Sequence, residues 1–476
     1  MDLPICIIGG GPTGITLAYI LGKLGKKCII IDKNASLGGC HRVTRVNGLF
    51  SEHAPRVYSS SYLNTIMLLN KMNLNFTDLF TPYNFSIATI GGKSILNISI
   101  SELSKLAFEF IKLLFSPDHG KTVSMHTFMT DNKFKDQTID YIDRLCRLTD
   151  GAGADRYTLY EFLQLANQQS FYRLYQPRQP NDTGLFTLMG EKLVETRNVD
   201  ILLNTSVEIL NYDRSSNKIL NIKTSRGIIY CSNVILAISP LDMYYILNKS
   251  VKTSYTFGNL SKWVTKSSYI NDIGIMFHWD TKLTLPKVWG FPKSPWGIAF
   301  IVLSDYMDFK DSRSKTVITS CVTYLDVISP YTNKTAQQTA NKDELIAEVF
   351  RQIKMSYPDY DLVNATTSFM SPTVRRYNDR WNETDSAYVK THNNSYLSPY
   401  GTINNLYNVG TQNGKSLYNF TSFESAITNA IAFVHDFIPS SKVEYSIKAP
   451  YSISSFICHT TLIVTLIYVY KKFISK

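Results

Sequence analysis

Ile5-Cys6-Ile7-Ile8-Gly9-Gly10-Gly11-Pro12-Thr13-Gly14 is the stretch of the sequence that decides the fold. Its first four residues are wholly apolar, as in a buried parallel strand, and the rest fits the pattern G-x-G-x-x-G. A helical pattern follows and ends at Gly25, and a second apolar strand, Cys28-Ile29-Ile30-Ile31, ends at Asp32. Strand, glycine loop, helix, strand and acid thus follow one another as in a dinucleotide-binding βαβ unit.

Each part of this unit has a physical task in binding a dinucleotide. Gly9 allows a tight turn, Gly11 lets the backbone approach a pyrophosphate, and Gly14 lets helix and strand pack closely. Pro12 and Thr13 stand where the helix begins, and its free N–H groups and positive dipole end favour phosphate. The loop therefore predicts a phosphate site.

Asp32 stands 18 positions after Gly14 (32 − 14), close to the spacing of about 20 expected for the acid that binds ribose. Its carboxylate can accept both ribose hydroxyls, and an acid here disfavours a 2′-phosphate. Because NAD and FAD both use this unit, the fingerprint alone leaves the choice between them open.

The segment after Asp32 points to one superfamily. Lys33 opens a short loop that ends in Leu37-Gly38-Gly39. An acid followed by Leu-Gly-Gly resembles the flavin-containing amine oxidase superfamily, which includes protoporphyrinogen oxidase, phytoene desaturases, UDP-galactopyranose mutase and Rab GDP-dissociation inhibitor.

That resemblance implies that FAD is the dinucleotide and that Lys33 and Gly39 contact it. In the superfamily an Arg usually follows the glycines, whereas here Cys40 holds that place. Arg42 is therefore our candidate for the phosphate contact. The alternative is that Gly38-Gly39 is only a flexible turn.

Two distant segments extend the resemblance. Residues 200–240 alternate as strands around a polar turn, similar to the superfamily's returning β-meander, which implies that Val207 contacts the adenine through its backbone. Residues 406–412 and 423–427 resemble the C-terminal flavin motif. The contacts that this motif implies are Gly410, Thr411, Gln412 and Ala426. Gln412 replaces the usual acid, and Ser425 replaces the usual glycine and would bring a side chain close to the cofactor.

No motif fixes catalytic residues. Residues 49–56 match the place where the superfamily's chain passes the flavin, so His53 and Arg56 are weak candidates for flavin or substrate contact. The alternative is that they only stabilise a turn. Tyr388 is a weak candidate for the aromatic cage that amine oxidases of this superfamily carry. No cysteine lies between Cys321 and Cys458, so the resemblance implies non-covalent FAD.

Composition excludes several other classes. The chain has 476 residues, 44% of them hydrophobic, which excludes a wholly disordered protein. Its net charge of +11 is diffuse, and we expect no nucleic-acid partner. The 7 cysteines and 8 histidines form no C-x-x-C or paired-histidine spacing, so we expect no metal.

The C-terminal end suggests a membrane. Residues 453–470 contain no Asp, Glu, Lys or Arg and are followed by Lys471 and Lys472. As a helix they would span about 27 Å, close to the hydrocarbon thickness of about 30 Å. We expect a tail anchor at residues 453–470 after a linker at 438–452, with the lipid bilayer as partner, membrane localisation and a cytosolic catalytic part. The alternative is a buried helix or strand of the globular part.

The expected fold class is α/β: a Rossmann-like three-layer FAD/NAD(P)-binding domain built from N-terminal, middle and C-terminal segments, an α+β substrate domain and a C-terminal transmembrane helix. The FAD-binding domain is expected at residues 1–58, 183–245 and 400–437, and the substrate domain at 59–182 and 246–399.

The resemblance implies an FAD-dependent oxidoreductase of the amine-oxidase type, which transfers hydride from a C–N or C–C bond of a small or lipophilic substrate to flavin N5. Two alternatives stay open: a flavin-dependent mutase or isomerase, and a redox-inactive binding protein on the same fold.

Overall fold

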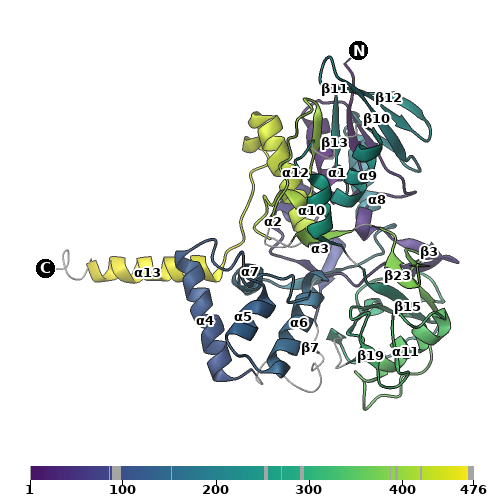
Figure 1. Ribbon diagram of the computed structural model, residues 1–476, viewed down its shortest axis with the longest axis vertical. Coiled ribbons are helices and arrows are strands. Elements are labelled where there is room, and N and C mark those ends of the chain that lie inside the picture. The colour runs from purple at the N-terminus through teal and green to yellow at the C-terminus, as the bar shows by residue number, and fades with distance from the viewer. Residues whose placement is uncertain are drawn as a thin grey trace.

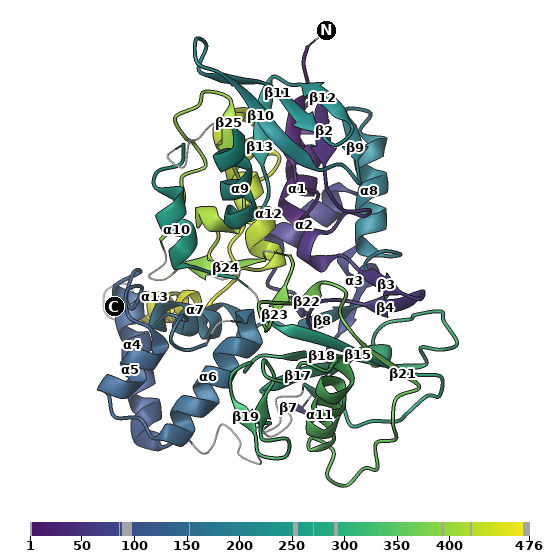
Figure 2. The ribbon, with the colours of Figure 1, turned by 45° about the vertical axis from the view of Figure 1, so that its right-hand side comes forward.

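A five-stranded parallel sheet forms the centre of the upper part of the molecule in the computed structural model (Figure 2). The structure describes residues 2–469 apart from 85, 88–97, 152, 251–255, 270, 290–293, 386, 392–394 and 419–420. The strands are parallel and lie in the order β25 (Leu406–Asn408), β13 (Asn233–Leu236), β1 (Ile5–Ile8), β2 (Cys28–Ile31) and β9 (Val199–Leu202). The predicted first two strands coincide with β1 and β2.

Alternation along β1 explains the layers on the two faces of this sheet. Ile5 and Ile7 pack into a core with α1 (Pro12–Lys23), α2 (Leu63–Lys71), α8 (Leu185–Glu195) and α12 (Phe423–Phe437). Cys6 and Ile8 pack on the other face. The elements there are α9 (Pro240–Ser250), α10 (Leu260–Lys266) and an antiparallel meander of β10 (Val207–Asp213), β11 (Lys218–Thr224) and β12 (Gly227–Tyr230). The Rossmann-like three-layer arrangement is therefore present.

Two further groups of elements lie below this sheet in Figure 2. One group is helical and consists of α4 (Ile100–Phe115), α5 (Met125–Asp131), α6 (Asp136–Asp150) and α7 (Leu159–Gln169). The other is an antiparallel sheet in the order β17 (Ile298–Val302), β18 (Thr316–Val322), β15 (Ile273–Trp279) and β21 (Thr367–Met370), with α11 (Lys342–Lys354) packed against it. Ala299 and Cys321 of this sheet belong to the same core cluster as the helices. The domain boundaries given above stay a prediction.

Short strands and turns connect these layers. The ones that bear on the site are the hairpin of β3 (Thr44–Val46) and β4 (Leu49–Ser51), the sheet of β5 (Tyr58–Ser59), β8 (Leu174–Pro177) and β6 (Phe80–Pro82), the hairpin of β22 (Val374–Tyr377) and β23 (Arg380–Glu383), and the pair of β14 (Ser267–Tyr269) and β24 (Tyr388–Thr391).

The expected transmembrane helix is not supported. The segment forms α13 (Ile453–Val469), 17 residues long, which includes Ser454, His459 and Thr465 and extends past α4 and α7 in Figure 1. In the described part of the chain no helix combines the length and apolarity that a membrane crossing needs. The structure therefore contradicts three of our predictions: the tail anchor at 453–470, the lipid bilayer as partner and the membrane localisation.

Candidate functional site

A cavity of about 950 Å³ opens along the carboxyl edge of the parallel sheet. Residues that directly follow four of its strands line it: Gly9 after β1, Asp32 after β2, Ala237 after β13 and Val409 after β25. Ligands of open α/β sheets bind outside the carboxyl ends of the strands, and this volume is in the range of small-molecule and cofactor sites. The cavity is therefore the candidate site.

The glycine loop meets the cavity in the way that the spacing predicted. Gly9, Gly11, Pro12 and Thr13 line it. A Cβ on Gly14 would lie 1.9 Å from the Gly9 carbonyl oxygen, so Gly14 serves close packing inside the loop. A Cβ on Gly11 would have Gly39 Cα, at 3.6 Å, as its nearest neighbour, so the backbone at Gly11 is bare toward the cavity.

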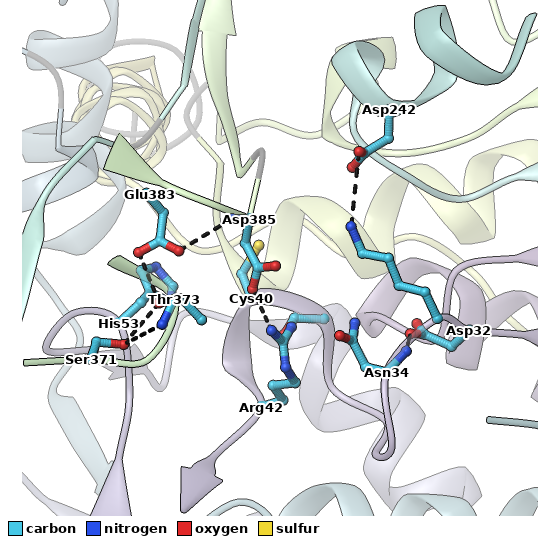
Figure 3. Close-up of polar contacts among 12 residues, drawn as sticks. Asp32, Asn34, Cys40, Arg42, His53, Asp242, Ser371, Thr373, Glu383 and Asp385 are labelled. Carbon is cyan, nitrogen blue, oxygen red and sulfur yellow. Dashed lines mark hydrogen bonds and ion pairs between the residues drawn. The ribbon is translucent and has the colours of Figure 1, made fainter. Parts of the chain in front are cut away.

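Asp32 and Lys33 directly follow β2 and also line the cavity, and Asp32 lies beside Asn34 (Figure 3). The Asp32 carboxylate is buried and accepts two backbone N–H groups at 2.7 Å, from Gly10 and Asn34. These bonds fix its position below the glycine loop. Lys33 reaches Asp242 of α9 at 4.0 Å.

The second glycine pair packs directly on the first loop. Gly38 N–H donates to the Gly10 carbonyl at 2.8 Å, and a Cβ on Gly39 would come within 3.0 Å of Gly11 Cα. Gly38 and Gly39 both have positive φ, which a residue with a side chain rarely adopts. The pair thus packs closely on the glycine loop that lines the cavity, as a contact with the cofactor would require.

Arg42 lines the cavity but has a partner that the sequence did not suggest. Its guanidinium donates to the Asp385 carboxylate at 2.6 Å (Figure 3), and the two residues are 343 positions apart. The Asp385 N–H in turn donates to Glu383 at 3.2 Å. Asp385 also lines the cavity. Arg42, which we expected to contact a phosphate, therefore lies at the site but is paired with an acid.

The middle and C-terminal segments complete the same cavity. It is also lined by Val207 of β10 and by Gly410, Thr411, Gln412 and Ala426. The Thr13 hydroxyl donates to the Ala426 carbonyl at 3.3 Å. Among the described residues the Gln412 side-chain nitrogen is buried without a hydrogen-bond partner. A ligand acceptor would satisfy it.

Ser425 does not enter the cavity. Its hydroxyl donates to the Ser422 carbonyl at 2.9 Å and accepts the Ser422 N–H at 2.8 Å, at the start of α12. The expectation that this serine crowds a cofactor is therefore wrong, because capping the helix turns its hydroxyl back onto the backbone.

His53 and Arg56 also line the cavity, whereas Tyr388 is not among its described lining residues. Arg56 contacts His53 Nδ1 at 2.6 Å and the Cys40 carbonyl oxygen. Burial and the charges of Arg56 and Arg42 hold the pKa of His53 well below its usual range, so this imidazole is neutral. Tyr388 begins β24, and its side chain lies outside the described residues.

The rest of the cavity is largely apolar and extends between the helices and the antiparallel sheet. Its walls there come from Leu145, Cys146, Leu148, Tyr157, Phe162 and Leu165 on one side and from Ala299 and Cys321 on the other. Asp272, which directly precedes β15, lines this end too. Asp272 and Asp385 were not identified from the sequence. Asp272 shows in the sequence only as an acid before an apolar strand, and Asp385 only as an acid in a loop, and neither pattern indicates a site.

The comparisons with known proteins agree with this geometry. The family of NAD(P)-binding Rossmann-like domains matches residues 7–71. A thiamine thiazole synthase from Methanoculleus marisnigri is 44% identical over 39 residues, and the match spans only 15% of that protein and 8% of this chain.

Solved structures match almost the whole chain. An oxidoreductase from Methanosarcina mazei is 12% identical with a TM-score of 0.65, covering 91% of this chain and 100% of its own. A putrescine oxidase bound to putrescine is 13% identical with a TM-score of 0.65, covering 92% and 99%. Cyclohexylamine oxidase from Brevibacterium oxydans is 11% identical with a TM-score of 0.62, covering 92% and 100%. The fold is therefore that of amine oxidases and related oxidoreductases, and the predicted resemblance is confirmed at the level of the fold.

Proposed function

We propose that this protein is an FAD-dependent oxidoreductase of the amine-oxidase type that binds its cofactor non-covalently. The observation that carries the proposal is that one cavity joins the bare backbone at Gly11, the buried Asp32 carboxylate and the C-terminal residues Gly410 to Gln412. The N-terminal segment, the segment of Val207 and the C-terminal segment, which are far apart in the sequence, thus converge on a space large enough for a dinucleotide.

The residues fit such a cofactor at both of its ends. Gly11 and the N-terminus of α1 would hold the pyrophosphate, because Gly11 lines the cavity without a side chain and a helix N-terminus favours phosphate. Asp32 would accept the ribose hydroxyls, and Val207 would lie at the adenine. The unpartnered amide nitrogen of Gln412 would donate to the other half of the cofactor.

The chemistry of the site would come from the cofactor and its surroundings together. Bound FAD supplies an acceptor for a hydride from a C–H bond of the substrate, while the adjacent C–N or C–C single bond becomes a double bond and the neighbouring N–H or C–H loses a proton. The chain's own part is to orient the substrate between α6, α7 and the antiparallel sheet and to exclude water with the apolar residues there. His53 stays neutral, and Arg56 brings a positive charge to the middle of the cavity.

The experiment that tests the proposal is the identification of a bound flavin. Purified protein should be yellow, and acid should release FAD into the supernatant, where chromatography identifies it. A Gly11→Val variant should retain less than a tenth of the flavin, because its side chain would occupy the place where the backbone approaches the cofactor, and its thermal midpoint checks that it folds.

Gly190→Ala is the matched control, because this glycine of α8 is not among the cavity residues and its Cβ would lie 3.3 Å from the flexible end of Leu37. It should keep the colour. A colourless protein that refuses added FAD would overturn the proposal in favour of the redox-inactive binding protein. A yellow protein that converts a substrate without net reduction of its flavin would favour the mutase or isomerase.

A further inference from the structure

Asp272 occupies a particular place in the apolar end of the cavity. It directly precedes β15 and lines the cavity together with Ala299 and Cys321 of the neighbouring strands. Two residues further on, a Cβ on Gly274 would lie 2.2 Å from the His53 carbonyl oxygen, so this glycine lets the segment of His53 pass close to β15. Asp272 therefore stands where the apolar end meets the segment that carries His53 and Arg56.

Most other charged groups around the cavity already have partners. Arg147 of α6 illustrates this, because it donates to Asp143 at 2.9 Å and its guanidinium lies 4.3 Å from the centre of the Tyr324 ring. The remaining pairs are Arg42 with Asp385 at 2.6 Å and Lys33 with Asp242 at 4.0 Å, while Asp32 accepts two backbone N–H groups.

Asp272 differs from all of these groups. Within the described part of the chain no hydrogen bond and no ion pair within 4.0 Å joins its carboxylate to another residue, and Arg147, already paired, acts on it only from a longer distance. The other groups that face it are Glu383 of β23 and the Cys321 thiol of β18. Burial raises the pKa of Asp272 to about 7, with Arg147 opposing and Glu383 adding to the rise.

A carboxylate in apolar surroundings is costly unless a positive charge compensates it. Arg147 also lines this end of the cavity, but its guanidinium is committed to Asp143, and Arg56 makes no ion pair with Asp272 within the described part of the chain. A ligand that brings a cationic nitrogen to Asp272 and an apolar body to the walls would remove this cost. A polycyclic or other neutral hydrocarbon ligand would leave it in place.

We propose that Asp272 binds a cationic nitrogen of the ligand, so that this cavity takes an amine or other organic ammonium ion with an apolar body. The proposal deepens the proposed function, on which it rests for the role of that ligand as substrate. It also makes a binding prediction that needs no turnover, since the ion pair forms with any ammonium ion that fits.

The test compares n-hexylamine, which is cationic at neutral pH, with the uncharged 1-hexanol by titration calorimetry on the purified holoprotein. Wild-type protein should bind hexylammonium at least tenfold more tightly than hexanol. Asp272→Asn should abolish that preference and leave the affinity for hexanol unchanged.

Asp280→Asn is the matched control. Asp280 directly follows β15 at its other end, is exposed, and accepts the Thr366 hydroxyl at 3.1 Å. This variant should bind both ligands as the wild type does. The thermal midpoint of Asp272→Asn should be no lower than that of the wild type at pH 8, because the substitution removes an uncompensated charge, and this checks that the variant folds.

A permanent cation adds a pH readout that does not depend on the ligand's own titration. Hexyltrimethylammonium should bind more tightly as the pH rises from 5.5 to 8.5, through the raised pKa of Asp272, which is about 7, because only the carboxylate form attracts it. Asp272→Asn should show no such dependence.

Equal affinity of hexylammonium for wild type and Asp272→Asn, equal binding of hexylamine and hexanol by the wild type, or binding of neither probe would overturn the proposal. Its failure is distinguishable from that of the proposed function. A yellow protein without cation preference contradicts only the role of Asp272, and a colourless protein that binds hexylammonium through Asp272 contradicts only the flavin.

Discussion

The two ends of the cavity are built on opposite principles. At the sheet end, the glycine backbone at Gly11 and Gly39 packs together and lines the cavity, and Asp32 is held by two backbone N–H groups, from Gly10 of the glycine loop and from Asn34. At the other end, apolar side chains from α6, α7 and the antiparallel sheet surround Asp272, which has no such support. The contacts expected from Gly11 and Asp32 thus depend on spacing within the N-terminal segment, whereas ligand choice depends on how distant segments assemble.

The largest effect is expected at the sheet end, where Gly14→Ala should lower the free energy of unfolding. Its Cβ would lie 1.9 Å from the Gly9 carbonyl oxygen, a contact between two backbone segments that cannot rearrange cheaply. We expect the free energy of unfolding to fall by about 3 kcal/mol or more. Urea denaturation measures it, with Gly11→Ala as the control, which should unfold like the wild type. A Gly14→Ala protein of unchanged stability would show that α1 does not need this close contact.

A smaller effect is expected from Asp32→Asn. An amide oxygen can replace only one carboxylate oxygen, so the N–H of Gly10 or of Asn34 loses its acceptor, and the ribose hydroxyls lose a charged partner. The dissociation constant for FAD should rise 10- to 100-fold, equivalent to about 1–3 kcal/mol. Titration of the flavin-free protein with FAD measures this. Asp200→Asn, on the exposed side of β9, should leave the affinity as it is, and an equal loss in both variants would argue against a role of Asp32 in binding.

The smallest effect concerns Glu52, which directly follows β4, is buried, and precedes the cavity residue His53. Burial raises the pKa of Glu52 to about 7, although Arg56 opposes the rise. The folded state therefore holds the proton more tightly than the unfolded chain, and the stability that this gives is present below about pH 4.5 and is lost as the pH rises through 7. From pH 5 to pH 8 the wild type should lose roughly 2 kcal/mol relative to Glu52→Gln.

Denaturation of both proteins at the two pH values checks this prediction. Glu191→Gln, at an exposed position of α8, is the control and should follow the wild type. A constant difference between Glu52→Gln and the wild type across this range would mean that Glu52 is not the group that titrates.

Much of the sheet end could be predicted from the sequence, because its signals lie within short distances along the chain. β1 and β2 coincide with their predicted apolar runs, and Gly11 and Asp32 reach the cavity as the spacing required. The pairing of Arg42 with Asp385 could not be predicted, because it depends on a loop 343 positions away.

The ligand end gave no comparable signal. Asp272 is an ordinary acid before an apolar strand, and only the folded arrangement leaves it among apolar walls without an ion pair. The C-terminal segment shows the opposite error. Its lack of charged residues indicated a membrane span, but polar residues such as Ser454, His459 and Thr465 lie in this segment, and no described helix combines the length and apolarity of a membrane crossing.

The order of strands in the parallel sheet has a consequence for biosynthesis. β13 pairs with both β1 and β25, so the edge of the sheet formed by β13 stays open until the ribosome has produced residues 406–408. A nascent chain thus carries a complete glycine loop long before the helix α12 that packs against α1 exists. Such long-range pairing slows folding and leaves an unpaired strand edge exposed during translation. Chains that terminate early should therefore aggregate and should not capture the cofactor.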